Sequence, residues 1–234
     1  MSKNLFITGT GTDVGKTYVT GLIVKKLREN KKNAAYYKAA MSGNERRADG
    51  SLIPGDALQV KTVAGIEQPT EEMCPYIYEN AVSPHLAARI ESNPVDMGRV
   101  LECFDDVCHK YDYVTVEGSG GILCPLRFDE QKIQLEDFIK ARKLSCLMIA
   151  DAGLGAINSV VLTAEYMKVH QLPVKGIVFN HYEQGNTLHE DNILMCESMT
   201  GLRVLACVKD GDNDLDIPFE LLESLYEYNE REAK

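Results

Sequence analysis

Short apolar runs alternate along the chain with longer stretches in which hydrophobic residues recur at helical spacing. The apolar runs predict buried strands at residues 5–7, 34–38, 113–116, 146–150, 174–179 and 204–208. The longer stretches predict helices near residues 17–28, 56–64, 86–90, 95–110, 135–142, 157–170, 189–199 and 219–228. Strands that are apolar throughout and separated by helices are typical of a parallel sheet covered on both faces.

This alternation predicts an α/β fold with three layers, in which helices cover both faces of a mostly parallel central sheet. The chain has 234 residues, which is enough for one such domain. No internal repeat and no low-complexity linker divides it. We therefore expect residues 1–234 to form a single domain.

Charge and cysteine content narrow the class of protein. The net charge of −10 disfavours nonspecific binding to nucleic acid or anionic lipid. Seven irregularly spaced cysteines favour a reducing compartment, and no apolar run approaches the ~20 residues that cross a bilayer. We expect a cytoplasmic protein with neither nucleic acid nor membrane as a partner. Residues 209–234 carry nine acidic and three basic side chains, and we expect a solvated terminal helix there.

The segment after the first predicted strand has the composition of a phosphate-binding loop. Its sequence is Gly9-Thr10-Gly11-Thr12-Asp13-Val14-Gly15-Lys16-Thr17, and a predicted helix follows. The glycines let backbone N–H groups point inward, Lys16 can reach the β- and γ-phosphates, and the Thr17 hydroxyl can coordinate Mg²⁺. The general pattern has its first glycine at position 10, whereas here Gly9 stands one place earlier. The loop predicts binding of a nucleoside triphosphate with Mg²⁺.

Three charged residues near predicted strand or helix ends are candidates for the same site. Glu117 follows the strand at 113–116 and precedes a glycine cluster, a position that suits metal ligation. Asp56 follows Pro54-Gly55, where an aspartate either caps the helix or binds a metal. Lys38 ends its strand, where it either neutralises a phosphoryl group or is simply solvated. The residues alone leave these alternatives open for Asp56 and Lys38.

Several motifs, taken in order, resemble the dethiobiotin synthetase family, whose members have a P-loop nucleotide-binding fold. The resemblance runs from residue 4 to about residue 181, and only the ordered set makes it specific. The motifs are the loop Gly9–Thr17, Tyr37-Lys38 with Ser42-Gly43, Asp56-Ala57-Leu58, Ser83-Pro84-His85, Val116-Glu117-Gly118-Ser119-Gly120-Gly121, and Asn180.

The resemblance implies an ATP- and Mg²⁺-dependent ligase of biotin biosynthesis. Its substrates would be 7,8-diaminopelargonic acid (7,8-diaminononanoate), CO₂ and ATP. One amine would capture CO₂ as a carbamate, which would attack the γ-phosphate to give a carbamic–phosphoric anhydride. The second amine would close the ureido ring, giving dethiobiotin, ADP and phosphate. The family also implies a homodimer with sites at the subunit interface.

Family roles fall on matching positions of this sequence. As the resemblance implies, Mg²⁺ would be held by Thr17, Asp56 and Glu117, which favours the metal-binding interpretation of Asp56. The catalytic residues would be Lys38, Lys16 and Thr12. The nucleotide would contact Asp13, Val14, Gly15, Lys16, Thr17, Tyr18 and, at the base, Asn180. The diamine or its carbamate would contact Thr12, Lys38 and Ser42, while Gly155 and Asn158 would receive the substrate carboxylate from the partner subunit.

Two departures and two alternatives accompany this resemblance. Asp13 stands where many family members carry glutamate, and the stretch 207–210 lacks the family's usual base-pocket motif. A ParA/MinD-like nucleotide switch is one alternative, although the extra lysine typical of its loop is missing at Thr10, Gly11 and Thr12. A related synthetase that activates a different carboxylate is the other.

Overall fold

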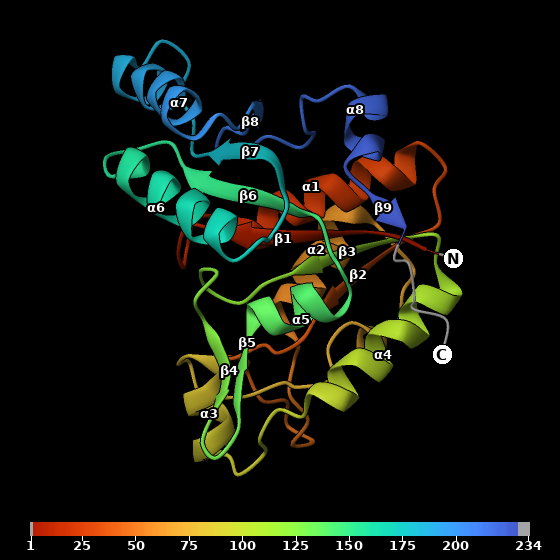
Figure 1. Ribbon diagram of the computed structural model, residues 1–234. Helices are drawn as coiled ribbons and strands as arrows, with labels where there is room; N and C mark the ends of the chain where they lie inside the picture. The colour runs from red at the N-terminus through yellow and green to blue at the C-terminus, as the bar shows by residue number, and fades with distance from the viewer. Residues whose placement is uncertain (1, 229–234) are drawn as a thin grey trace.

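The computed structural model describes residues 2–228, and its centre is a twisted sheet (Figure 1). The parallel strands follow one another across the sheet in the order β2 (Ala34–Lys38), β3 (Tyr113–Glu117), β1 (Lys3–Gly9), β6 (Cys146–Asp151), β7 (Val174–Asn180) and β8 (Val204–Cys207). The carboxyl ends of these strands therefore meet along one edge of the sheet. In such a sheet, ligands bind at this edge.

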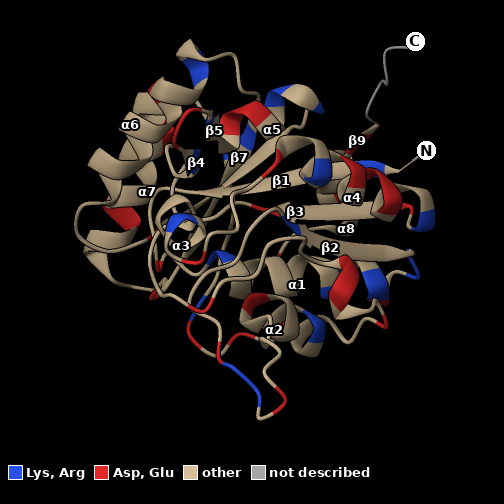
Figure 2. Cartoon of the chain, turned by 90° about the horizontal axis from the view of Figure 1, so that it is seen from below, with Lys and Arg blue, Asp and Glu red and all other residues tan. Residues whose placement is uncertain are grey.

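Helices cover both faces of the sheet because side chains alternate along each strand. On β1, Leu5 and Ile7 pack into one core with α1 (Lys16–Glu29), α2 (Gly55–Ala64) and α8 (Phe219–Ser224), whereas Phe6 packs into the other. That second core includes residues of α3 (Pro84–Ile90), α4 (Met97–Lys110), α5 (Leu135–Ala141), α6 (Ala156–Val169) and α7 (Thr187–Thr200). Charged residues lie mainly on helices and loops outside the sheet (Figure 2). The expected three-layer α/β fold with a mostly parallel sheet is confirmed.

Close packing of α1 on α2 brings the start of α2 toward the sheet edge. A Cβ atom at Gly21 of α1 would lie 2.9 Å from the Val63 side chain of α2, closer than real contacts allow. The absence of a side chain at Gly21 therefore lets the two helices approach. This approach places Asp56, in the first turn of α2, near the end of β2.

The structure contains four short elements that the sequence did not predict. A hairpin of β4 (Pro125–Phe128) and β5 (Lys132–Gln134) stands where a loop was expected, and a 3₁₀ turn, η1, covers Thr70–Glu72. The expected terminal helix ends at Ser224, and the chain then forms β9 (Glu227–Tyr228), antiparallel to β1.

The expected terminal helix forms over Phe219–Ser224 only, and its continuation is wrong because an aromatic side chain anchors the segment that follows. Tyr226 is 3% exposed, and its hydroxyl lies 2.6 Å from the Thr115 hydroxyl. Residues 229–234 lie outside the part of the chain that the structure describes. Within residues 2–228, no helix is both long enough and apolar enough to cross a membrane.

Candidate functional site

The loop between β1 and α1 leaves backbone N–H groups free for an anion. Gly15 is the N-cap residue of α1 and has a φ of 82°, in the left-handed region that glycine adopts readily. No side chain caps the helix, and its first turn contains no acidic residue. The first N–H groups of a helix have no partner within the helix, so this end of α1 suits a phosphate.

The early position of Gly9 has a steric cause. A Cβ atom at Gly9 would lie 2.9 Å from Cδ of Lys16, so the stem of Lys16 passes over the bare backbone of this glycine. The Lys16 ammonium donates to the carbonyl of Gly11 at 2.8 Å. Lys16 therefore folds over its own loop, where a phosphate would meet it.

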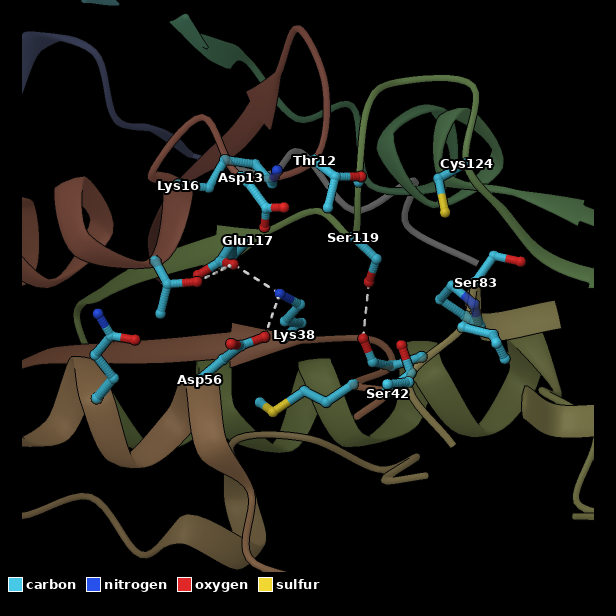
Figure 3. A pocket seen from close by; sticks show the side chains of 18 of the residues that line it. Thr12, Asp13, Lys16, Lys38, Ser42, Asp56, Ser83, Glu117, Ser119 and Cys124 are labelled. Carbon is cyan, nitrogen blue, oxygen red and sulfur yellow. Dashed lines mark hydrogen bonds and ion pairs between the residues drawn. The ribbon is translucent and has the colours of Figure 1, made fainter. Parts of the chain in front are cut away.

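A cavity of about 810 Å³ opens beside the loop, and Figure 3 shows the side chains around it. Its volume is in the range of small-molecule sites. Among the residues singled out from the sequence, those that line it are Thr12, Asp13, Gly15, Lys16, Thr17, Tyr18, Lys38, Ser42, Asp56 and Glu117. The structure thus brings together residues from the loop, the end of β2, the start of α2 and the end of β3.

Lys38 bridges two carboxylates at the base of this cavity (Figure 3). Its Nζ lies 2.6 Å from Oδ2 of Asp56 and 2.6 Å from Oε1 of Glu117. The hydroxyl of Thr17 donates to the same Oε1 at 2.9 Å, and that of Tyr36 donates to Oε2 at 3.0 Å. The Lys38 side chain is 7% exposed, so the interpretation of a solvated lysine is wrong.

Burial and the charges around the cavity shift the pKa values of Lys16 and Lys38 in opposite directions. Burial alone would lower the pKa of Lys38, but Glu117 and Asp56 outweigh it and raise that pKa above its ordinary value. Burial lowers the pKa of Lys16, and repulsion from the Lys38 ammonium lowers it further. Lys38 therefore stays protonated. A bound anion would raise the lowered pKa of Lys16 and so favour its charged form.

Asp56 does not cap α2. The helix begins at Gly55 with Pro54 as its N-cap residue, and no side chain bonds to its first N–H groups. The Asp56 carboxylate points instead to Lys38, which settles against the capping interpretation.

The donor set around Lys38 suits a magnesium ion. The oxygens of Thr17, Asp56 and Glu117 converge, and Mg²⁺ prefers one or two carboxylates completed by phosphate and water. Residues 2–228 contain no group of three or more His, Cys, Asp or Glu side chains that could hold a metal by themselves. A cation here would accordingly share its coordination with the Thr17 hydroxyl and a bound phosphate.

The remaining predicted residues lie outside the cavity. The side chain of Val14 is buried, and its carbonyl accepts a hydrogen bond of 3.3 Å from the Asn180 amide. Gly155 and Asn158 line a second cavity of about 570 Å³ between α6 and α7. The chain by itself therefore does not bring Gly155 and Asn158 to the phosphate loop.

Sequence reasoning assigned no role to several residues that border the main cavity. Gln59 lies one turn after Asp56, and this helical spacing could have indicated it. Ser83 and Ser119 belong to motifs that were noticed without a role. Nothing in the sequence around Cys124 indicates a binding role, because the path of a loop alone brings its side chain to the cavity (Figure 3).

Comparison with solved structures shows the fold alone. The MinC:MinD cell division protein complex of Aquifex aeolicus matches with a TM-score of 0.56 at 12% identity, covering 89% of this chain and 81% of that one. The septum site-determining protein MinD of Pyrococcus horikoshii OT3, complexed with Mg-ADP, matches with a TM-score of 0.51 at 12% identity over 96% of both chains. At such identities the likeness gives no reason to prefer a nucleotide switch.

Comparison with protein families and curated relatives shows the family as well as the fold. The family described as "AAA domain" matches residues 3–213. The "ATP-dependent dethiobiotin synthetase BioD" of Clostridium botulinum (strain Loch Maree / Type A3) is 47% identical over 227 residues, which cover 97% of this chain and 99% of the relative. The protein of the same name from Brachyspira hyodysenteriae is 48% identical over 217 residues, covering 92% and 96%. The chain therefore belongs to the AAA domain family and, more narrowly, to the ATP-dependent dethiobiotin synthetases.

Proposed function

We propose that this chain uses ATP to carboxylate 7,8-diaminopelargonic acid and to close its ureido ring, giving dethiobiotin, ADP and phosphate. Family membership supports the reaction. The observation that carries the assignment of residues is the contact of Lys38 with both Asp56 and Glu117, directly below the phosphate loop. This contact gathers the charges that a phosphoryl transfer between two anions requires.

The reaction needs close-range positive charge because a carbamate and a triphosphate repel each other. In this proposal the amides at the start of α1 and Lys16 hold the β- and γ-phosphates. Lys38 lines the same cavity from the end of β2 and neutralises the carbamate as it attacks the γ-phosphate. Holding the two anions in one geometry lowers the entropic part of the barrier.

The diamine occupies the part of the cavity away from the start of α1. The hydroxyl groups of Thr12 and Ser42 border this part, and Ser83 and Ser119 add two more (Figure 3). We assign Thr12 and Ser42 to the carbamate or its parent amine, which hydroxyls can serve as donors or acceptors. Ser119 already donates to the carbonyl of Ala40 at 2.8 Å, so its hydroxyl helps to fix the cavity wall.

Thr17, Asp56 and Glu117 would hold Mg²⁺ together with the β- and γ-phosphates. The bound ion supplies positive charge where the leaving ADP oxygens gain negative charge. Lys38 pairs with both carboxylates, so it would share its partners with the ion. Asp13, Val14, Gly15 and Tyr18 contribute loop or side-chain contacts to the nucleotide, and Asn180 contacts its base.

A second copy of the chain completes the site in this proposal. The face formed by α6 and α7 exposes large apolar side chains, with Leu154 93%, Leu162 63% and Met199 52% exposed. A monomer rarely leaves such a patch uncovered. The face contains Gly155 and Asn158, so dimerisation through it would bring this segment toward the partner's diamine and its carboxylate. We also propose that the enzyme works in the cytoplasm.

The direct test is a product assay with purified protein, diaminopelargonate, bicarbonate, Mg²⁺ and ATP. Dethiobiotin and ADP should appear in equal amounts, and omission of the diamine should abolish the ADP release. ATP hydrolysis without dethiobiotin, stimulated instead by DNA or lipid vesicles, would contradict the proposal and favour a nucleotide switch.

A further inference from the structure

The side-chain amide of Asn180 is held in one orientation by two hydrogen-bond acceptors. Its Nδ2 donates to the carbonyl of Val14 at 3.3 Å and lies 3.0 Å from Nε2 of His181. A backbone carbonyl only accepts, so the nitrogen of the amide, not its oxygen, must face Val14. The amide also lies against Gly15, where a Cβ atom would come within 2.0 Å of Nδ2.

The contact with Asn180 fixes the proton on the ring of His181. An amide N–H only donates, so Nε2 must accept and the ring proton must be on Nδ1. Nδ1 lies 2.6 Å from Oδ2 of Asp151, an acceptor that requires the proton there. The same carboxylate accepts from the N–H of Gly153 through Oδ1 at 2.7 Å. Asp151, His181 and Asn180 therefore form a directed chain of hydrogen bonds.

The sheet places this chain of hydrogen bonds beside the phosphate loop. Asp151 ends β6 and pairs with Asn180, which ends β7, so both side chains emerge at the ligand-binding edge. His181 follows with a φ of 53°, a left-handed conformation that is uncommon for residues other than glycine. This backbone turns the ring back toward Asp151 rather than onward along the strand direction.

Both amide hydrogens of Asn180 are used in this arrangement. Among residues 2–228, no donor bonds to its Oδ1, so this atom of the 2% exposed Asn180 side chain is the one whose hydrogen-bonding capacity is unused. The inference rests on the proposed function, in which Asn180 contacts the nucleotide base. We infer that His181 and Asp151 are positioning residues that present Oδ1 of Asn180 as an acceptor, so that the site selects a base with an exocyclic amine over one with a carbonyl at the same position.

Replacement of Asp151 by asparagine should reverse the chain of hydrogen bonds. The new amide oxygen keeps the bond from Gly153, so its NH₂ group faces Nδ1 of His181. The ring then carries its proton on Nε2, opposite the NH₂ group of Asn180, and two donors meet. The Asn180 amide cannot relieve this contact by rotating, because its Oδ1 would then face the Val14 carbonyl, so it is displaced and no longer holds Oδ1 in a fixed place.

The test compares equilibrium binding of Mg·ATP and Mg·ITP, which differ by an amine or a carbonyl at position 6 of the purine. Wild-type protein should prefer ATP by about tenfold, roughly one hydrogen bond. D151N and H181A should each reduce this preference toward one, because Asn180 loses the partner that holds its amide in place. Tripolyphosphate, which has no base, should bind all three proteins equally.

The matched control is D210N. Asp210 lies 3.9 Å from Nε2 of His181 and is 85% exposed, so its replacement removes a nearby negative charge without breaking the chain of hydrogen bonds. D210N should keep the wild-type preference. The inference would be overturned if D210N and D151N lost the preference for ATP over ITP equally. It would also be overturned if D151N and H181A still bound ATP with an unchanged preference. A wild-type protein that binds neither nucleotide would instead refute the proposed function.

Discussion

At the scale of single residues, Lys38 balances the negative charge of the two carboxylates in the site. Its ammonium lies between the carboxylates of Asp56 and Glu117 and has almost no contact with water. A buried ion pair contributes little net stability, but loss of one partner leaves an uncompensated charge. The same ammonium thus pairs with two carboxylates and can also neutralise a bound anion.

We expect K38M to lose turnover and, without ligands, to be destabilised by about 3 kcal/mol, because two carboxylates lose their cation. Mg²⁺ with ATP should recover part of that loss by supplying charge to the same carboxylates. Urea denaturation with and without Mg·ATP measures both effects. A loss of stability that is identical in the two conditions would argue against metal binding by these carboxylates.

K61M is a suitable control for this experiment. Lys61 lies on α2 like Asp56, but its ammonium donates to the neutral carbonyl of Gln68 at 2.8 Å. Its replacement should lower the free energy of unfolding by about 1 kcal/mol, the usual net value of one hydrogen bond. Mg·ATP should stabilise K61M by the same amount as it stabilises the wild type.

The sequence predicts which residues belong to the site where these stand at the end of a strand. It does not predict how deeply their side chains are buried or which side chains they contact. Lys38 and Glu117 stand at the ends of strands that the apolar pattern located. That they touch depends on β2 and β3 being neighbours, with Lys38 opposite Glu117 in register. Tyr36 and His181 gave no signal, because each acts on a residue far from it in sequence or through an unusual backbone angle.

At the scale of elements, a cluster around Glu136 joins α5 to α6. Its carboxylate accepts from the hydroxyl of Tyr166 at 2.8 Å and from Lys140 at 3.1 Å, and it lies 2.9 Å from Nδ1 of His170. Burial alone would raise the pKa of Glu136, but the bonds from Tyr166 and Lys140 outweigh it and hold that pKa below the usual 4.5.

The contribution of Glu136 to the stability of the folded protein should therefore depend on pH. A lowered pKa in the folded state stabilises the protein fully above pH 4.5, and this stabilisation is lost as the pH falls through the folded value. Wild type should unfold at a higher temperature than E136Q at pH 7, and the difference should shrink below pH 4.5. Thermal unfolding of both proteins from pH 7 to pH 3.5 measures it, and a gap that widens on acidification would reject the assignment.

Long, regular elements were predictable and short ones were not. The apolar run at 34–38 coincides with β2 because a fully buried strand needs apolar residues on both faces. The hairpin of β4 and β5 was missed because its strands are short, partly exposed and interrupted by an irregular register near Pro125. Its place over α3 is set by tertiary packing rather than by local preference.

At the scale of the whole molecule, the apolar face of α6 and α7 bears on assembly. If this face joins two copies, L162E should place a charge in the interface and weaken dimerisation by at least about tenfold. Sedimentation velocity over a range of concentrations measures the effect. Val169 is also on α6 and 74% exposed, but it does not line the cavity with Gly155 and Asn158, so V169E serves as the control.

Dissociation of L162E should be accompanied by a higher KM for the diamine, since the partner would no longer supply Gly155 and Asn158. ATP affinity should change much less, because the phosphate loop belongs to one chain. A monomeric L162E with an unchanged KM for the diamine would show that the site does not need the second copy.

The pairing of β9 with β1 has a consequence for how the protein is made. β1 carries the phosphate loop, yet its neighbours come from residues near 115, 148 and, through Tyr228 opposite Lys3, from the last strand described. Contacts between segments so distant in sequence form slowly. During synthesis, β1 leaves the ribosome well before β9, and until β9 arrives part of the edge of β1 is open to wrong partners.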